Sequence, residues 1–435
     1  NGITKIAMSS GAGGVFTTLR QRPVIYWALY DCANSAFATT IMAGFFPIFF
    51  KQYWSAGDAS LSTFRLGLAN SLASFILALL APLLGAMADQ GKSRLRFLLA
   101  FTVLGVIASA GLYWVQMGAW QWAAAMYVAA SMGFWGGLIF YDSLLLDVSP
   151  PEKFDLVSGF GYGMGYLGGG VLFALNVWMT LQPSRFGLAD AAAAVRVSFL
   201  TVAIWWSVFS IPLLFGVKEK KSAPSLSFDR SLTAAFRELV RTFHEIRRYR
   251  ALLIFLLAYW LYIDGVNTVI KMAIDYGLAL GFPTASLIQA LLIVQFVGFP
   301  AAILFGWLGN RYGTLGGIFI GLTVYVGVTI YAVSMDDVRD FYYMAIAIGM
   351  VQGAVQSLSR SWFGALVPLD RAGEFFGFYN MVGKFASVLG PALMGITALL
   401  IGSRYSILSL VVLFVAGSAL LLKARNAARL SSHAE

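Results

Sequence analysis

Twelve long apolar runs, separated by short polar segments, most constrain how this chain of 435 residues folds. The hydrocarbon core of a bilayer is about 30 Å thick, so a helix that crosses it needs roughly 20 apolar residues. Each run is about that long, and we therefore predict an all-α membrane protein with twelve transmembrane helices. The runs lie near residues 24–50, 66–88, 97–116, 120–146, 156–181, 196–217, 253–281, 285–309, 314–335, 341–366, 374–401 and 404–424.

The composition excludes a soluble globule. Hydrophobic residues make up 59% of the chain and charged residues only 11%, whereas soluble domains carry about 25% charged residues. Because so little polar surface is available, lipid must cover most of the molecule.

The net charge of +10 would suit a nucleic-acid partner, but the placement of the charges indicates a topological role. Most of the 30 Lys and Arg residues fall in segments on the N-terminal side of the predicted membrane. This asymmetry follows the positive-inside rule. We therefore expect an inner-membrane protein with cytoplasmic termini, surrounded by lipids and without a nucleic-acid partner.

Cysteine and histidine are too scarce for a cofactor site. The single cysteine, Cys32, excludes an intrachain disulfide and a cysteine metal cluster. The two histidines, His244 and His433, fall in a polar connector and in the tail. We expect no metal, no cofactor and no enzymatic activity, because the sequence shows neither a metal-binding carboxylate cluster nor a nucleophile with its base.

The chain contains an internal repeat. The first and seventh runs share a Tyr-Trp pair followed by Asp, Asn and Ser or Thr, each at one constant interval. Two six-helix halves related by an axis along the membrane normal are the major facilitator architecture, which is the fold we predict. The repeated residues are Tyr26, Trp27, Asp31, Asn34 and Ser35 in the first run and Tyr259, Trp260, Asp264, Asn267 and Thr268 in the seventh.

A long polar break separates the halves. It opens with lysines and continues with apolar residues at spacings of three or four, among arginines, which is typical of an amphipathic helix on the inner leaflet. We predict a cytoplasmic leader (1–22), an N-terminal six-helix bundle (23–217), a cytoplasmic linker containing that helix (218–250), a C-terminal six-helix bundle (251–425) and a cytoplasmic tail (426–435).

Polar and ionisable residues inside the predicted membrane are the candidates for function. Burying such a charge in hydrocarbon costs roughly 3 kcal/mol or more, so it must face a cavity or a partner. The candidates for contact with the substrate or the coupling ion are Asp31, Asn34, Asp142, Asp264, Asn267, Lys271, Gln356, Arg360 and Lys384.

The two halves contribute unlike charges to the predicted cavity. The N-terminal half supplies Asp31 and Asp142, and the C-terminal half supplies three cations alongside Asp264 and Asp275. An acidic wall that faces a more basic one suits a zwitterion. We hypothesise that Lys271 and Arg360 hold the anionic end of the substrate. Asp31 or Asp264 would meet the amine, carry the coupling proton, or both.

Structural interpretations of the same charges stay open. Lys271 and Asp275 are four residues apart and could neutralise each other on one helix face. Asp264 and Arg360 could form a fixed pair between helices. The oxygens of the Asp-x-x-Asn pattern could also hold Na⁺, although we favour protons as the coupling ion because carboxylates with cationic neighbours titrate readily.

The loop between the second and third runs resembles the facilitator signature G-x-x-x-D-x-x-G-[RK]-[RK], with its second glycine one residue early. It contains Asp89, Lys92 and Arg94, and the matching loop of the second half contains Asn310 and Arg311. We expect a cytoplasmic gate in which Asp89 accepts hydrogen bonds from loop arginines and a helix N-terminus. The corresponding contact in the matching loop of the second half should be weaker, since Asn310 is not acidic. An ordinary positive-inside loop is the alternative.

Four stretches are similar to the bacterial "unknown major facilitator" family, relatives of the fungal autophagy-related vacuole effluxers. The resemblance implies the facilitator fold and, by analogy with the fungal members, transport of amino acids. The vacuolar lumen corresponds topologically to the periplasm, so the implied direction is import. The stretches are YDCANSAFATTIMAGFFPIFF from Tyr30, LAYWLYIDGVNTVIKMAIDYGLALGF from Leu257, QSLSRSWFGALVP from Gln356 and EFFGFYNMVGKFASVLGP from Glu374.

We therefore predict a monomeric secondary active transporter that moves a small polar or zwitterionic solute, an amino acid being favoured, by proton-coupled alternating access. The alternatives are Na⁺ coupling, another solute class (peptides, cell-wall fragments, sugar phosphates or drugs), and a non-transporting receptor or scaffold on the same fold.

Overall fold

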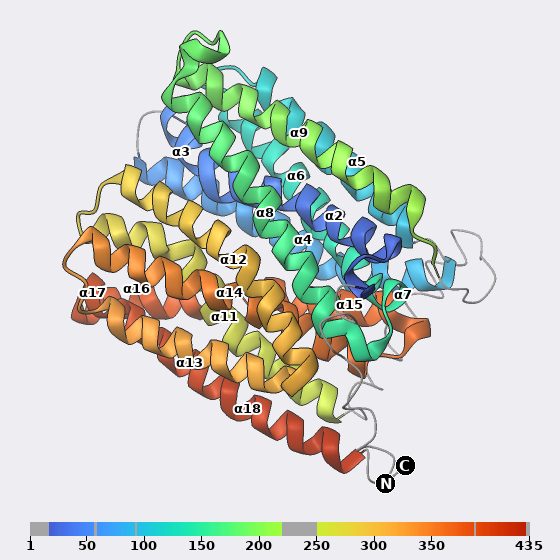
Figure 1. Cartoon of the computed structure of the whole chain (residues 1–435). Helices are drawn as coiled ribbons and strands as arrows, with labels where there is room; N and C mark the ends of the chain where they lie inside the picture. Colours follow the sequence, from blue (N-terminus) through green and yellow to red (C-terminus); the bar gives the residue numbers. More distant parts are fainter. Residues whose placement is uncertain (1–16, 56–58, 92–93, 220–249, 387–388, 432–435) are drawn as a thin grey trace.

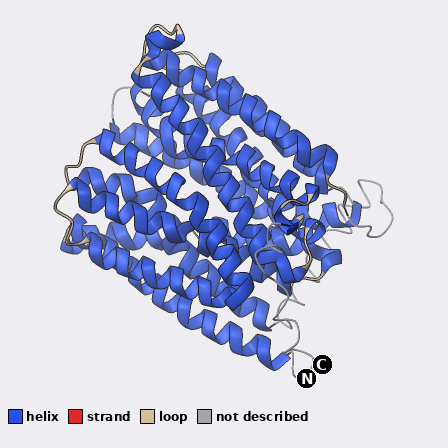
Figure 2. Cartoon of the chain, viewed as in Figure 1, coloured by secondary structure: helices blue, strands red, loops and turns tan. Residues whose placement is uncertain are grey.

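The computed structural model describes residues 17–55, 59–91, 94–219, 250–386 and 389–431. Within these ranges the chain is helical and contains no strand (Figure 2). The predicted amphipathic helix of the linker and most of the predicted leader lie outside the described residues.

The N-terminal half, blue to green in Figure 1, contributes six crossings. The first crossing contains two π-helical segments, and short 3₁₀ turns connect others. The elements are α2 (Arg22–Ala36), η1 (Phe37–Phe45), α3 (Phe46–Phe49), η2 (Phe50–Trp54), α4 (Ala59–Gly91), α5 (Arg94–Gly111), η3 (Leu112–Trp114), α6 (Trp120–Ser143), α7 (Leu145–Val148), η4 (Pro151–Lys153), α8 (Phe154–Leu181), η5 (Pro183–Phe186) and α9 (Ala191–Gly216).

The C-terminal half, yellow to red in Figure 1, lies beside the first half and also contributes six crossings. Its fifth crossing consists of two helices, α15 and α16. The elements are α11 (Arg250–Ala279), α12 (Thr284–Tyr312), α13 (Thr314–Ala332), α14 (Val338–Leu366), η6 (Leu369–Arg371), α15 (Ala372–Phe385), α16 (Leu389–Ile401), α17 (Ser403–Ser406), η7 (Ile407–Ser409) and α18 (Leu410–Ser431).

The helices have the length and surface of membrane spans. In the described chain, eleven crossings are long and apolar enough to cross a membrane. The 33-residue α4 completes the twelve by packing against α6 and α15. Large apolar side chains such as Phe215 and Leu400 are 86% and 77% exposed, as expected for groups that face lipid. The prediction of twelve helices is confirmed, although α18 continues to Ser431, beyond the predicted bundle boundary.

The two halves repeat one packing arrangement. In the first half α2 packs on α8 and α9, and α5 packs on α6 and α9. In the second half α11 packs on α15 and α18, and α13 packs on α14 and α18. The repeat in the sequence therefore corresponds to a repeat in three dimensions.

Acidic caps set the start of two helices. The Asp190 side chain accepts a hydrogen bond from the backbone N–H of Ala193 at 2.7 Å, which begins α9. Asp337 and Asp340 form a capping box at the start of α14. Such caps satisfy N–H groups that have no partner within the helix.

Glycines bring the two halves into contact at the end of the bundle where α2 begins and α18 finishes, hereafter the terminus end. A Cβ atom at Gly377 of α15 would lie 2.6 Å from the carbonyl oxygen of Ala81 in α4. A Cβ atom at Gly159 of α8 would lie 2.6 Å from the carbonyl oxygen of Ala302 in α12. Because the helices approach backbone to backbone, they form a tight seal at this end.

The crossing formed by α15 and α16 is interrupted, whereas the sequence predicted one run over 374–401. Both oxygens of Asp264 on α11 accept from α16, at 3.0 Å from the N–H of Leu389 and 2.8 Å from that of Gly390. The Asn267 amide donates to the carbonyl oxygen of Ala386 at 2.9 Å. The first N–H groups of a helix lack internal partners, and lipid offers none. The polar face of α11 therefore supplies hydrogen-bond partners for the backbone groups at the interruption.

Replacing Gly377 with Ala should open the seal at the terminus end, since neither backbone can move aside. Spin labels at Glu152 and Asp370, which are exposed at this end of the two halves, should move further apart in a Cys32→Ala background. Gly327→Ala is the matched control, because a Cβ atom there meets nothing within 4 Å. An unchanged distance distribution in Gly377→Ala would contradict the seal.

Replacing Asp264 with Ala should destabilise the protein by leaving two buried N–H groups unsatisfied, at about 1–3 kcal/mol each. The thermal midpoint should fall by roughly 2 °C or more, and Asp264→Asn, which keeps one oxygen, should lose less. Asp336→Asn at an exposed position provides the control. Equal midpoints for Asp264→Ala and the wild type would show that Asp264 does not hold the interruption.

Candidate functional site

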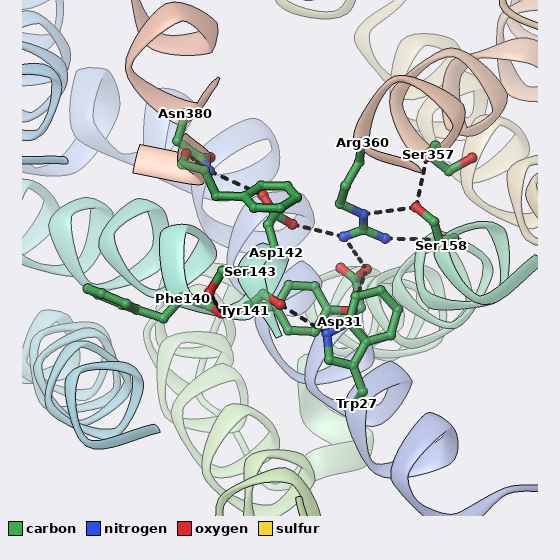
Figure 3. Close-up of polar contacts among 11 residues, drawn as sticks. Trp27, Asp31, Phe140, Tyr141, Asp142, Ser143, Ser158, Ser357, Arg360 and Asn380 are labelled. Atoms are coloured by element: carbon green, nitrogen blue, oxygen red, sulfur yellow. Dashed lines mark hydrogen bonds and ion pairs between the residues drawn. The ribbon is translucent and has the colours of Figure 1, made fainter. Parts of the chain in front are cut away.

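Arg360 of α14 is the centre of a buried charge cluster between the two halves (Figure 3). The residue is 1% exposed. Its Nη1 lies 3.0 Å from Oδ1 of Asp142 on α6 and 3.8 Å from Oδ2 of Asp31 on α2. Two carboxylates of the first half thus share one guanidinium of the second.

Ser158 and three aromatic rings enclose the rest of the guanidinium. Arg360 donates from Nε to the Ser158 hydroxyl at 2.9 Å and from Nη2 to the Ser158 carbonyl oxygen at 3.1 Å. The guanidinium also lies 4.8 Å from the ring centroid of Trp27, 5.5 Å from that of Tyr141 and 4.4 Å from that of Tyr162. Aromatic faces stabilise a cation most where water is excluded.

The carboxylates are also held by neutral donors. The Tyr141 hydroxyl donates to Asp31 Oδ2 at 3.1 Å, and the Asn380 amide donates to Asp142 Oδ2 at 3.2 Å (Figure 3). Asp31, Asp142, Ser158, Arg360 and Asn380 are hereafter the Arg360 cluster. If both carboxylates are ionised, their charge exceeds that of the guanidinium by one.

The internal repeat itself builds this cluster. Arg360 and Asp142 are 218 residues apart and occupy equivalent positions of the repeat, near the terminus end of α14 and α6. Both stand out in the sequence as charges inside apolar runs. The structure brings them together as a pair of opposite sign across the interface.

A second polar contact joins the halves closer to the terminus end. Asp155 at the start of α8 accepts from the Thr314 hydroxyl at 2.7 Å and from the Ser361 hydroxyl. Sequence analysis missed Asp155, which directly precedes the predicted fifth run and looks like an ordinary acidic residue of a first helical turn.

The predicted gate residues lie at the same end. Arg94 is buried, pairs with Asp147 at 2.9 Å and donates to the carbonyl oxygen of Leu369 in the other half at 3.4 Å. Arg311 is exposed and lies over the ring of Trp307, and Asn310 is half-buried. Lys92 lies outside the described residues, as does the side chain of Asp89, so the predicted role of Asp89 stays a prediction.

The two intramembrane lysines lie apart from the Arg360 cluster. Lys384, half-buried on α15, places its ammonium group over the ring of Trp135 on α6. Lys271 is exposed on α11. The alternative that Asp275 neutralises Lys271 is not tested, because the Asp275 side chain lies outside the described residues.

The remaining candidates have different environments. Asn34 is 1% exposed, and its Nδ2 has no hydrogen-bond partner in the described part of the chain. Gln356 is half-buried on α14, one turn before Arg360. Asp264 and Asn267 hold the interrupted crossing as described above. The described ion pairs of Arg360 involve Asp31 and Asp142, so the alternative of a fixed Asp264–Arg360 pair finds no support.

The described residues contain no group of three or more His, Cys, Asp or Glu side chains arranged to hold a metal ion. The arrangement can, however, bind and release a proton, because two carboxylates face one buried cation. It can also lock the two halves, because both ion pairs of Arg360 with described residues cross the interface.

Comparison with known proteins identifies the family. The family model described as "Vacuole effluxer Atg22 like" matches residues 53–152 and 147–429. An uncharacterized MFS-type transporter of Bacillus subtilis, YxiO, is 38% identical over 402 residues, which cover 91% of this chain and 93% of that protein. Autophagy-related protein 22 of Yarrowia lipolytica is 24% identical over 269 residues, covering 55% of this chain and 45% of that protein.

Solved structures show the same fold. The human organic anion transporter MFSD10 superposes with a TM-score of 0.71 at 14% identity, covering 92% of this chain and 99% of that one. The transporter FucP in its outward conformation superposes with a TM-score of 0.67 at 11% identity, covering 94% and 99%. The predicted family resemblance and the major facilitator fold are confirmed. The chain therefore belongs to the Atg22-like vacuole effluxer family, whose members are major facilitator transporters and not enzymes.

Proposed function

We propose that this protein is a secondary active transporter of the plasma membrane that moves a small polar solute, an amino acid being favoured, by proton-coupled alternating access. Its termini would lie in the cytoplasm, as the distribution of basic residues indicates. The observation that carries the proposal is the Arg360 cluster, in which buried charges of the two halves meet at the interface.

The position of the cluster links its charge state to the conformation. Alternating access requires the terminus end to open at one stage of the cycle. The Gly377 and Gly159 contacts must then part, and Arg360 must leave Asp142 and Asp31. Breaking a buried ion pair without replacement costs about 3–5 kcal/mol. A bound proton lowers this barrier because it removes one of the separating charges.

Asp31 is the better candidate for the proton-binding group. Asp142 contacts Arg360 at 3.0 Å and also accepts from Asn380, whereas Asp31 lies 3.8 Å from the guanidinium. Coulomb attraction falls with distance, so a proton on Asp31 removes the weaker of the two ion pairs of Arg360. One ionised carboxylate then remains opposite one guanidinium.

The geometry changes the earlier hypothesis about the substrate. Arg360 already faces two carboxylates and three aromatic rings in this conformation. Lys271 is therefore the better candidate of the two predicted residues for the anionic end of the solute. An amino acid stays the favoured solute because the resemblance of the sequence to the fungal vacuole effluxers implies it. The corresponding direction for a plasma-membrane protein is import.

Transport by purified protein in proteoliposomes tests the proposal. An inward proton gradient should drive accumulation of one or more labelled amino acids, and a Na⁺ gradient alone should not. Asp31→Asn should abolish gradient-driven accumulation but retain exchange of labelled for unlabelled solute, because only the proton-binding step is lost. Asp336→Asn at an exposed position is the control.

Two results would contradict the proposal. Gradient-driven accumulation at the wild-type level in Asp31→Asn would exclude that residue as the coupling group. Absence of both accumulation and exchange in the wild-type protein, with amino acids and with the alternative solute classes, would favour a receptor or scaffold.

Arg360→Gln should destabilise the protein by about 3–5 kcal/mol, because it leaves two buried carboxylates without their cation. The triple variant Asp31→Asn, Asp142→Asn, Arg360→Gln should recover much of this loss, since no unpaired charge remains. Thermal unfolding in detergent compares the two. A triple variant less stable than Arg360→Gln would contradict the assignment of the cluster as one ionic unit.

A further inference from the structure

Lys271 and Lys384 carry positive charge within the membrane-spanning part of the second half, away from the Arg360 cluster. An intramembrane ammonium group is costly unless a partner or water compensates it. Among the ion pairs of the described residues, none involves either lysine. Among the side chains that the structure describes, therefore, neither cation has a carboxylate in an ion pair with it; the Asp275 side chain lies outside that part of the chain.

Contacts at the interrupted crossing place these lysines near one another. Asn267 of α11 reaches the carbonyl oxygen of Ala386 at 2.9 Å. Lys271 lies one turn beyond Asn267 on the same helix face, and Lys384 precedes Ala386 by two residues. Lys271 is also the neighbouring charge that acts on Lys384. Two like charges so placed repel each other until an anion lies between them.

Asp264, the carboxylate of α11 whose side chain the structure describes, is already engaged. Asp264 attracts Lys271, but it lies two turns away and both of its oxygens accept backbone hydrogen bonds from α16. It contributes attraction at a distance rather than a salt bridge. Among the described side chains, the lysine pair is therefore left available to a ligand.

Trp135 gives the pair a contact with the opposite half. The ammonium group of Lys384 lies over the Trp135 ring, a cation–π contact that is weaker than a charge-assisted hydrogen bond to a carboxylate. An anion arriving between the halves can therefore replace the ring as the partner of Lys384.

We propose that Lys271 and Lys384 form a subsite for a carboxylate group and that the transported solute carries net negative charge, as an acidic amino acid or a dicarboxylate does. The inference rests on the proposed transport function and narrows its substrate class. Its basis is the balance of ionisable groups: two carboxylates face the one guanidinium of the Arg360 cluster, whereas no described carboxylate forms an ion pair with either lysine.

Ligand binding to the full-length protein in detergent tests the subsite. L-Glutamate and succinate should raise the thermal midpoint in a concentration-dependent manner. L-Glutamine, which has nearly the shape of glutamate without the second charge, and L-lysine should raise it far less. Lys271→Gln and Lys384→Gln should each weaken glutamate or succinate binding about tenfold to a hundredfold.

Two variants serve as references. Lys423→Gln removes an exposed lysine of α18 and should leave binding unchanged. Lys384→Arg keeps the charge and should retain more affinity than Lys384→Gln, which a purely structural role in packing against Trp135 would not require.

Several outcomes would overturn the subsite: equal stabilisation by glutamine and glutamate, full affinity in both Gln variants, stabilisation by glycerol 3-phosphate in place of the carboxylates, or no stabilisation by any of these anions. The outcome is separable from transport itself. Proton-driven uptake of a neutral solute would leave the proposed function standing without the subsite. Carboxylate binding that depends on both lysines, without any transport, would support the subsite and contradict the proposed transport function.

Discussion

The contact of Arg360 with Asp142 and Asp31 is the interaction on which the arrangement of the two halves depends. A buried guanidinium cannot be left without a counter-charge, and two buried carboxylates cannot be left without a cation. The first half supplies the acids and the second half supplies the base. Neither half therefore balances its own buried charges. The seal formed by Gly377 and Gly159 holds the two halves together around the Arg360 cluster.

The internal repeat explains why such a contact exists. The different residues in its two copies explain why the first half supplies the acids and the second half the base. Equivalent positions of a repeat meet near the pseudo-symmetry axis, which is where Asp142 and Arg360 lie. Asp31 and Asp264 are also equivalent, yet Asp31 faces Arg360 while Asp264 holds the start of α16. One of the two repeated carboxylates thus lies at the interface, and the other supports the backbone within its own half.

Hydropathy predicts the number and order of the helices, because a bilayer imposes its thickness on every span. The same reasoning finds Asp31, Asp142 and Arg360, since charges stand out in apolar runs. It does not identify which residues pair, because that depends on how the halves dock. It misses Asp155 and Ser158, which look like ordinary residues at a helix start. The interruption after Phe385 is equally hidden, because its backbone groups are satisfied by Asp264 and Asn267 from a distant helix.

The two helices of the interrupted crossing, α15 and α16, pack against different halves of the protein. α15 packs on α4 and α6 of the opposite half, whereas the main neighbours of α16 are α11, α17 and η7 of its own half. A continuous rod would transmit any tilt at one membrane face to the other. Two shorter helices with different neighbours, α15 on the opposite half and α16 on its own, need not move together. The first half has an unbroken α8 at the equivalent position. The two halves therefore need not move in the same way.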